Sequence, residues 1–211
     1  MTQTVDQETA TTPQQRVDAW LGEFEAALKA RDVRRAASLF AAASYWRDLI
    51  SFSWNIVTVE NPAGVTDLLG ETLDRTDPSF FVTDEPPTEA DGVTTAWFTF
   101  ETAVGRGNGL LRLVEEDGEA KAWTFLTTMY ELKGHEEPRG DARPMGTEHG
   151  AHRDRATWLE RRQREEADLG VGTHPDVLVI GGGQGGIALG ARLRQLGVPS
   201  LVIDKHARPG D

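Results

Sequence analysis

One stretch near the end of this 211-residue chain has the residue types and spacing of a dinucleotide-binding turn. Four apolar residues, Val177 to Ile180, lead into the pattern Gly-x-Gly-x-x-Gly formed by Gly181, Gly183 and Gly186. A second apolar run ends at Asp204, about 20 residues further on, which is the spacing of that fingerprint. The pattern predicts a strand, a helix and a second parallel strand, with the helix N-terminus facing a pyrophosphate.

Each residue of the pattern has a geometric role. Gly181 permits a tight turn, Gly183 lets the backbone approach the pyrophosphate, and Gly186 lets the helix pack closely on the strands. Asp204 is placed to accept hydrogen bonds from a ribose diol, and its charge would repel a 2′-phosphate, which disfavours NADP at this particular site. The predicted cofactor-binding residues are Gly181, Gly182, Gly183, Gln184, Gly185, Gly186, Asp204 and Lys205.

The glycine pattern alone is a weak signal, because the chain contains 22 glycines. The alternative is a glycine-rich turn between a strand and a helix of some other α/β domain. That alternative does not require an acidic residue at the end of the second strand, so Asp204 favours the dinucleotide interpretation.

Residues 181–189 and 202–211 resemble the FAD-binding opening of flavin-containing monooxygenases. The resemblance implies FAD as the cofactor, NADPH as a co-substrate bound by a second Rossmann domain outside this chain, and oxygen activated at the flavin. This sequence contains no second glycine fingerprint and ends at Asp211. We therefore expect only the first βαβ unit of a Rossmann-type FAD-binding domain, and an inactive fragment that binds FAD weakly or not at all.

Composition limits the other classes of function. The absence of cysteine excludes disulfides, zinc–thiolate sites and a thiol nucleophile. The net charge of −12 argues against nucleic acid or an anionic membrane surface as a partner. Neither a secretory signal nor a run of membrane-spanning length is present, which predicts a cytoplasmic protein. The resemblance to flavin-containing monooxygenases implies a small-molecule substrate.

Residues 12–134 are predicted to form a compact domain that begins with helices. Thr12 and Gln15 have the spacing of a capping box, with Pro13 at the first helical position. Asp32 is placed to cap a second helix that carries Ala36, Leu39 and Phe40, and a third helix begins near Asn61. The first helix has an apolar stripe at helical spacing, formed by Val17, Trp20, Leu21, Phe24, Ala27 and Leu28.

After Asp77-Pro78 the pattern changes to strands. Residues 93–104 alternate between apolar and polar positions, residues 110–115 follow, and Asp117-Gly118 is a hairpin signal before residues 122–132. Helices followed by an antiparallel meander predict an α+β fold in which a curved sheet wraps over the helices.

This order of elements resembles the cone-shaped domain of the SnoaL-like and ketosteroid isomerase-like superfamily, also called nuclear transport factor 2-like. Residues 45–48 (YWRD) and 121–126 (KAWTFL) carry the resemblance, and they also resemble an N-terminal extension found on some flavin-containing monooxygenases. The resemblance to the cone-shaped superfamily implies a pocket inside the cone and, as one option, a homodimer formed through this domain. The candidates for chemistry in such a pocket are Asp48, Tyr45, Arg47 and Tyr130.

The simpler interpretation of residues 45–48 is structural. Tyr45 and Trp46 would be core aromatics, while Arg47 and Asp48 would form an ion pair at a helix start. Spacing alone defines no geometry between a base and a hydrogen-bond donor, and a fold does not imply a function. We therefore predict no catalytic residue in this domain.

Residues 135–174 are predicted to be a linker, and residues 175–211 the start of the FAD-binding domain. The linker contains a helical stretch, Arg155 to Asp168, which Trp158 is expected to dock onto one of the domains. His149 and His152 are two residues apart, as metal ligands can be, but no third ligand is near, so no metal site is predicted.

Three functions remain open. The chain is the N-terminal part of a flavin-dependent monooxygenase, which uses FAD and NADPH to oxygenate a small organic substrate. Alternatively, its cone domain is non-catalytic and serves dimerisation or substrate capture. In the third hypothesis the cone domain is a small isomerase or hydratase.

Overall fold

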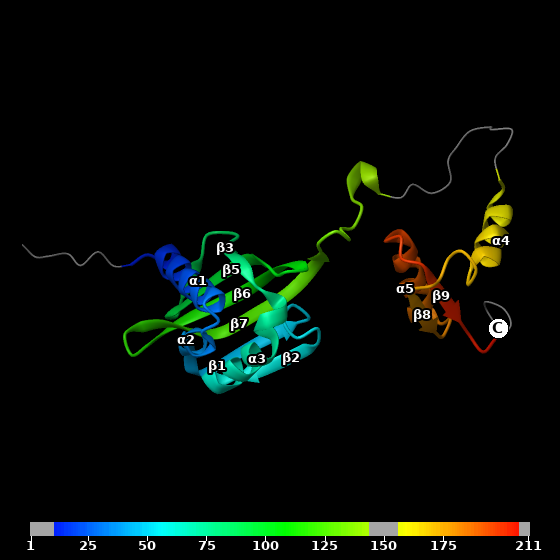
Figure 1. Ribbon diagram of the computed structural model, residues 1–211. Coiled ribbons are helices and arrows are strands. Elements are labelled where there is room, and N and C mark those ends of the chain that lie inside the picture. Colours follow the sequence, from blue (N-terminus) through cyan, green and yellow to red (C-terminus); the bar gives the residue numbers. More distant parts are fainter. Residues whose placement is uncertain (1–10, 144–155, 207–211) are drawn as a thin grey trace, which may run out of the picture. The chain divides into compact units, whose positions relative to one another are not determined.

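The computed structural model describes residues 11–143 and 156–206 (Figure 1). They fall into two compact units, the first ending at Glu136 and the second beginning at Glu137. No helix among the described residues is both long and apolar enough to cross a lipid bilayer.

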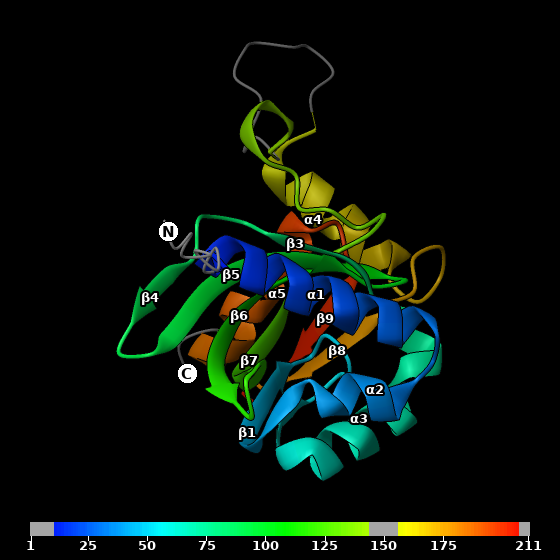
Figure 2. The ribbon, with the colours of Figure 1, turned by 90° about the vertical axis from the view of Figure 1, so that its left-hand side faces the viewer.

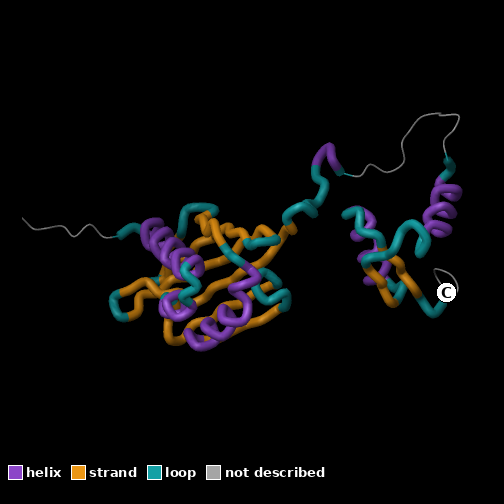
Figure 3. The backbone as a smooth tube through the Cα atoms, viewed as in Figure 1, coloured by secondary structure: helices purple, strands orange, loops and turns teal. Residues whose placement is uncertain are grey.

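The first unit is a sheet with helices on one face, as Figures 2 and 3 show. Its helices are α1 (Pro13–Lys29), α2 (Val33–Ser38) and α3 (Asn61–Thr76). Its strands are β1 (Phe40–Leu49), β2 (Ile56–Glu60), β3 (Ser79–Thr83), β4 (Thr88–Ala90), β5 (Val93–Glu101), β6 (Gly105–Glu116) and β7 (Glu119–Leu132). The strand order is β2-β1-β7-β6-β5-β3, with β4 paired to β5. This arrangement confirms the predicted α+β class.

The local signals for the helices are confirmed. The Thr12 hydroxyl accepts the Gln15 N–H at 3.2 Å, and the Gln15 side chain accepts the Thr12 N–H at 2.9 Å, which closes the capping box. Asp32 caps α2 by accepting the Arg35 N–H at 3.0 Å. The predicted apolar stripe of α1 is buried throughout.

The sheet differs from the prediction in two respects. Strands β1 and β2 precede Asp77, and β1 pairs in parallel with β7, so the sheet is mixed and the expectation of a purely antiparallel sheet is wrong. Leu39 caps the end of α2 and Phe40 begins β1, although the sequence placed both residues in a helix. A run of alanine and serine after Phe40, together with an irregularity in the register before Tyr45, hides the alternation of a strand.

The predicted meander of β5, β6 and β7 is confirmed. Ala96, Phe98 and Phe100 are buried on one face of β5, whereas Trp97 points to the other. Asp117 and Gly118 both have positive φ values, 55° and 79°, as a two-residue hairpin turn requires.

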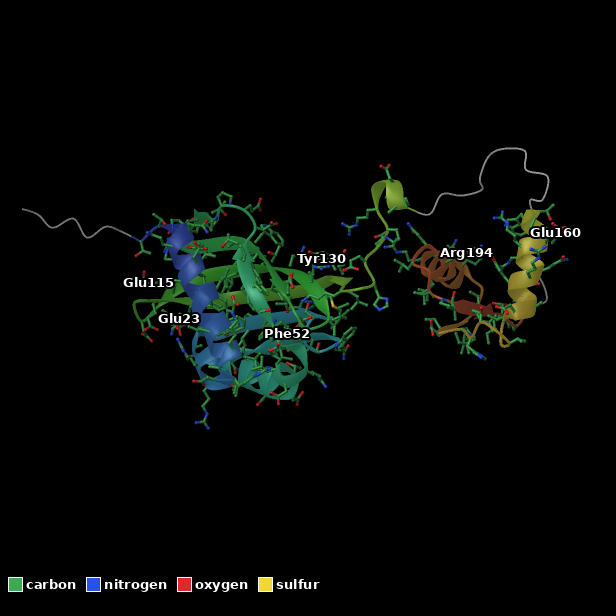
Figure 4. All side chains as sticks on the ribbon, turned by 45° about the horizontal axis from the view of Figure 1, so that its top comes forward. Glu23, Phe52, Glu115, Tyr130, Glu160 and Arg194 are labelled. Atoms are coloured by element: carbon green, nitrogen blue, oxygen red, sulfur yellow. The ribbon has the colours of Figure 1, made fainter. Side chains whose placement is uncertain are left out.

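Aromatic side chains fill the concave side of the sheet. The ring of Phe125 lies 5.3 Å from Phe24, 5.2 Å from Trp46 and 5.1 Å from Phe98, measured between centroids. Phe52, labelled in Figure 4, belongs to the same buried cluster. The interior of the cone is thus a packed core, in which aromatic pairs add to the hydrophobic stabilisation.

Glycines on strand β6 make room for this core. Gly105, Gly107 and Gly109 all point inward, and a Cβ on Gly107 or Gly109 would overlap the ring of Phe100 or Phe98, respectively. The rings therefore occupy the space that side chains of β6 would otherwise fill.

The second unit contains a parallel pair of strands joined by a helix. Its elements are η1 (Gly140–Ala142), α4 (Trp158–Asp168), β8 (Val177–Ile180), α5 (Gln184–Gln195) and β9 (Ser200–Ile203). Strands β8 and β9 pair in parallel with Val177 opposite Ser200, so the predicted order of strand, helix and strand is present.

Helix α4 begins at Trp158, three residues later than predicted, because Thr157 and Glu160 form a capping box there. Trp158 is 68% exposed, so the described contacts do not give it the predicted role of an anchor. His149, His152 and the last five residues of the chain lie outside the described residues.

Candidate functional site: the glycine turn between β8 and α5

The turn that follows β8 contains the glycines that the sequence predicts to bind a pyrophosphate. Gly181 has a φ of 109°, which favours glycine, and its N–H donates to the Ile203 carbonyl at 2.7 Å. Gly183 is the N-cap of α5, without a side chain to satisfy the first N–H groups of the helix. These groups and the positive end of the helix dipole therefore face outward, available to an anion.

The glycines of this segment fall into two groups, those packed against neighbouring atoms and those that face open space. A Cβ on Gly186 would overlap the carbonyl oxygen of Gly181, and one on Gly190 would lie 3.0 Å from Cγ2 of Val202. These two glycines let α5 lie close to β8 and β9. At Gly183 and Gly185 a Cβ would meet nothing within 4 Å, so the turn is open where the pyrophosphate is expected.

Asp204 connects the end of β9 to the turn. Its Oδ2 accepts the Gly182 N–H at 2.6 Å and its Oδ1 accepts the His206 N–H at 2.9 Å. The backbone N–H groups of His206 and Gly182 lower the pKa of this carboxyl group below its usual value. The ionised carboxylate thus braces the turn, and its remaining lone pairs can accept from a ribose diol.

The other predicted residues lie in the same turn or directly after it. Gln184 and Gly185 form the exposed first turn of α5, and Lys205 is exposed beside Asp204. The carboxylate contact to the Gly182 amide was not predicted, because it depends on how the end of β9 meets the turn.

These residues fit the pyrophosphate and one ribose of a dinucleotide, and they provide no contacts for its ring systems. Among residues 156–206 the sheet has two strands, and Leu178 and Ile180 remain exposed, Ile180 at 81%. A parallel sheet is normally covered on both faces. The described residues of this unit therefore provide no enclosed pocket for a flavin ring.

Residues 45–48 do not form the arrangement expected from the sequence. They lie on strand β1, where Trp46 and Asp48 point into the core while Tyr45 and Arg47 point outward. Arg47 donates to the Thr58 hydroxyl at 3.3 Å and does not pair with Asp48, so the predicted ion pair at a helix start is wrong. Tyr45 is also exposed rather than part of the core.

Asp48 is fully buried, with 0% exposure, and every partner it has is a neutral donor. Its Oδ2 accepts the Ser53 N–H at 2.8 Å and the Ser53 hydroxyl at 2.7 Å, its Oδ1 accepts the Thr127 hydroxyl at 2.8 Å, and the Phe52 N–H lies 3.1 Å from Oδ2. Thr127 in turn accepts the indole N–H of Trp46 at 2.9 Å. A carboxylate enclosed in this way fixes the loop after β1 and is out of reach of a substrate.

Tyr130, the fourth candidate, is exposed near the end of β7 (Figure 4) and lies outside this network. In the described parts of the chain, no group of three or more His, Asp or Glu side chains is placed to hold a metal ion.

The register between strands, which the sequence does not define, brings three apolar residues together on the outer face of the sheet. Trp97 on β5 pairs with Leu110 on β6, which pairs with Leu126 on β7, so these side chains form one row across three strands. Trp97 is 44% exposed, and no helix of this unit covers the row.

Comparisons with known proteins give similarity at the level of the fold. No protein-family model and no curated protein matches the sequence. A domain of unknown function with a cystatin-like fold from Nostoc punctiforme is 11% identical, with a TM-score of 0.49 over 60% of this chain and 82% of that chain. An NTF2-like protein with a cystatin-like fold from Novosphingobium aromaticivorans is 8% identical, with a TM-score of 0.45 over 56% and 81%. ActVI-ORFA from Streptomyces coelicolor is 20% identical, with a TM-score of 0.43 over 54% and 94%.

Proposed function

We propose that the chain joins a non-catalytic α+β domain to the part of an FAD site that binds pyrophosphate and ribose. The observation that carries the cofactor proposal is the glycine turn. Its inward glycine, Gly186, has no room for a side chain, its outward glycine, Gly183, faces open space, and Asp204 is fixed beside it. These features support the proposal, because a dinucleotide turn requires close packing of the helix on the strands, an open approach for the pyrophosphate and an acidic residue for the ribose.

The enzyme to which this site belongs would be a flavin-dependent monooxygenase. FAD, when bound, would supply redox chemistry in which NADPH provides two electrons, one atom of O₂ is transferred to a small organic substrate and the other leaves as water. The first N–H groups of α5 would hold the pyrophosphate, and Asp204 would orient the ribose. This part of the proposal rests on the resemblance of residues 181–189 and 202–211.

ADP titration, followed by amide chemical shifts of the full chain, tests the cofactor proposal. We expect ADP to shift the amides of residues 182–187, and we expect Gly183→Val to abolish these shifts, because its side chain would fill the open space in front of the turn. A Gln195→Ala variant at the other end of α5 is the control. Shifts that persist in Gly183→Val, or that occur only outside residues 181–206, would contradict the proposal.

Self-association is the function we propose for the α+β domain. The row formed by Trp97, Leu110 and Leu126 is apolar, and it is bordered by polar and charged residues. Thr128 lies opposite Asn108 on one side, Arg112 lies between Thr95 and Thr124 on the other, and Arg47 on β1 pairs with Leu126. An aromatic and aliphatic centre with a polar rim is typical of an interface. A second copy of the chain would cover the same row by two-fold symmetry.

Sedimentation of the full chain tests this assignment. We expect a dimer that dissociates when Trp97 is replaced by Asp, because a charge would then be buried in the centre of the interface. Trp54→Asp, at an exposed tryptophan in the loop before β2, should leave the dimer intact. A monomeric wild-type chain, or equal effects of the two substitutions, would contradict self-association through this face.

The isomerase or hydratase hypothesis is not favoured. Aromatic rings fill the cone, and Asp48 is enclosed by neutral donors from Phe52, Ser53 and Thr127. A general base must lie within reach of the proton that it removes.

A further inference from the structure

A second feature of the α+β unit is a wedge between helix α3 and strand β2. Near the start of α3 the two elements are close, since a Cβ on Gly64 would lie 3.2 Å from the Cβ of Val59. Further along the helix an open groove of about 390 Å³ lies between them, and its charged lining residues on α3 are exposed. Its volume lies within the range of about 300–1,000 Å³ that is typical of small-molecule sites. The wedge is at the edge of the sheet, beside the aromatic core and not inside it.

The lining of the wedge divides into an apolar and a charged part. Val57, Val59 and Leu68 provide the apolar surface. Asp67 and Glu71 lie one turn apart on α3, and both line the groove. Arg75, on the next turn, also lines it, so carboxylates outnumber cations two to one.

The charged groups of the wedge are not neutralised by one another. Among the described residues, neither Asp67 nor Glu71 has an ion-pair or hydrogen-bond partner for its carboxylate, although Arg75 lies four residues beyond Glu71. The net charge of −12 on the whole chain adds to the negative potential. A cation is therefore the complementary ligand.

The wall opposite the helix is held in place before any ligand binds. The Ser53 hydroxyl donates to Asp48 at 2.7 Å and accepts the Asn55 N–H at 3.2 Å, so the buried carboxylate fixes this part of the lining. Asn55 uses its Oδ1 to accept the Ile56 N–H at 2.8 Å, which leaves its amide NH₂ group available. A wall that is already ordered reduces the entropy lost on binding.

We propose that this wedge binds a small organic cation, namely a protonated amine on an apolar body. The ammonium group lies between Asp67 and Glu71, and the apolar body covers Val57, Val59 and Leu68. The inference refines the alternative that the α+β domain captures substrates. It depends neither on FAD binding nor on self-association, so each of the three can fail alone.

The test uses the full chain and three probes of similar shape: 2-phenylethylamine, 2-phenylethanol and 3-phenylpropionate. We expect the amine to shift the amides of residues 53–59 and 67–75, with the alcohol binding more weakly and the carboxylate not at all. The double variant Asp67→Asn/Glu71→Gln should weaken amine binding about two- to tenfold, as expected for partly exposed ion pairs. It should leave the affinity for the alcohol unchanged.

Asp74→Asn is the matched control, because Asp74 is an exposed carboxylate on the same helix outside the wedge. The inference is overturned if amine and alcohol bind equally, if Asp74→Asn weakens amine binding as much as the double variant, or if the shifts map elsewhere. It is also overturned if the amine causes no shift at about 10 mM, a concentration well above the Kd of even a weak specific ligand. ADP titration and sedimentation of the same protein report separately on the proposed function.

Discussion

Replacing Asp48 with alanine should destabilise the α+β unit strongly. The carboxylate accepts from four donors: the N–H groups of Phe52 and Ser53 and the hydroxyls of Ser53 and Thr127. The hydroxyls can rotate toward other acceptors, and that of Ser53 already lies 2.9 Å from the Asn55 carbonyl. The two amides cannot rotate, and Phe52 is fully buried.

The magnitude follows from those two amides. A buried donor left without an acceptor costs about 1–3 kcal/mol, so two such donors lead us to expect a loss of about 2–6 kcal/mol in the free energy of unfolding. That is a large part of the ~5–15 kcal/mol that stabilises an ordinary domain. Asp48→Asn keeps the shape but turns an NH₂ group toward existing donors, and should cost about 2–3 kcal/mol by the same reasoning.

Urea denaturation followed by tryptophan fluorescence measures these changes, with Asp74→Asn as the exposed control. Hydrogen exchange of the Phe52 and Ser53 amides should become faster in both Asp48 variants. The reasoning is refuted if Asp48→Ala changes the unfolding free energy by less than about 1 kcal/mol, the size of a single ordinary hydrogen bond. An Asp48→Ala variant that stayed stable but no longer turned over a substrate would instead indicate that Asp48 is a general base, as in the isomerase or hydratase hypothesis.

Three further outcomes are expected. Gly109→Ala should destabilise the chain by about 1–3 kcal/mol, because its Cβ would overlap the Phe98 ring. Gly22→Ala in helix α1 should stabilise the chain by about 0.5–1 kcal/mol, because a Cβ there would meet nothing within 4 Å. Changes of the same sign in urea denaturation would contradict the packing argument. Burial raises the pKa of Glu25, but hydrogen bonds from Lys29, Phe80 and Phe81 outweigh this and lower it below 4.5. A carboxyl group whose pKa is lowered by folding stabilises the fold at pH values above its pKa in the unfolded chain, and this stabilisation is lost as the pH falls through its pKa in the folded chain. In acid titrations below pH 4.5 the wild type should therefore lose stability more steeply than Glu25→Gln. Parallel curves for the two proteins would exclude this contribution. The chain should bind FAD with a Kd of about 1 mM or weaker, since its described residues hold only pyrophosphate and ribose; a purified protein with stoichiometric yellow flavin, read by absorbance, would overturn that expectation.

The features that the sequence predicted correctly depend on neighbouring residues. The capping box of Thr12 and Gln15 spans one helical turn, and Asp117-Gly118 needs only its own backbone to turn the chain. The turn after β8 is local in the same sense, because a Cβ on Gly186 would overlap the carbonyl oxygen of the nearby Gly181. The role of this turn in binding a cofactor remains a prediction.

The features that the sequence missed depend on distant residues. Strand β1 exists because it pairs with β7, and its Asp48 bonds to Thr127, 79 positions away. Neither partner can be inferred from the residues around Asp48. The brace from Asp204 to the Gly182 amide spans 22 positions and likewise requires the folded turn. The wedge beside α3 needed strand β2, which was not expected at all.

The glycines of β6 have a consequence for the order in which the unit folds. Glycine loses more backbone freedom than any other residue when it becomes extended, and Gly105, Gly107 and Gly109 bring no side chain of their own to offset that loss. Arg106, which lies between Gly105 and Gly107, pairs with Glu131 on β7, but the space above Gly107 and Gly109 is filled only once Phe100 and Phe98 on β5 are in position. We therefore expect this half-strand to join the sheet after the transition state, so that substitutions at Gly109 accelerate unfolding and leave the folding rate nearly unchanged. The lifetime of the native unit would then be set in the middle of its sheet, by a segment in which every second residue from Gly105 to Gly109 lacks a side chain.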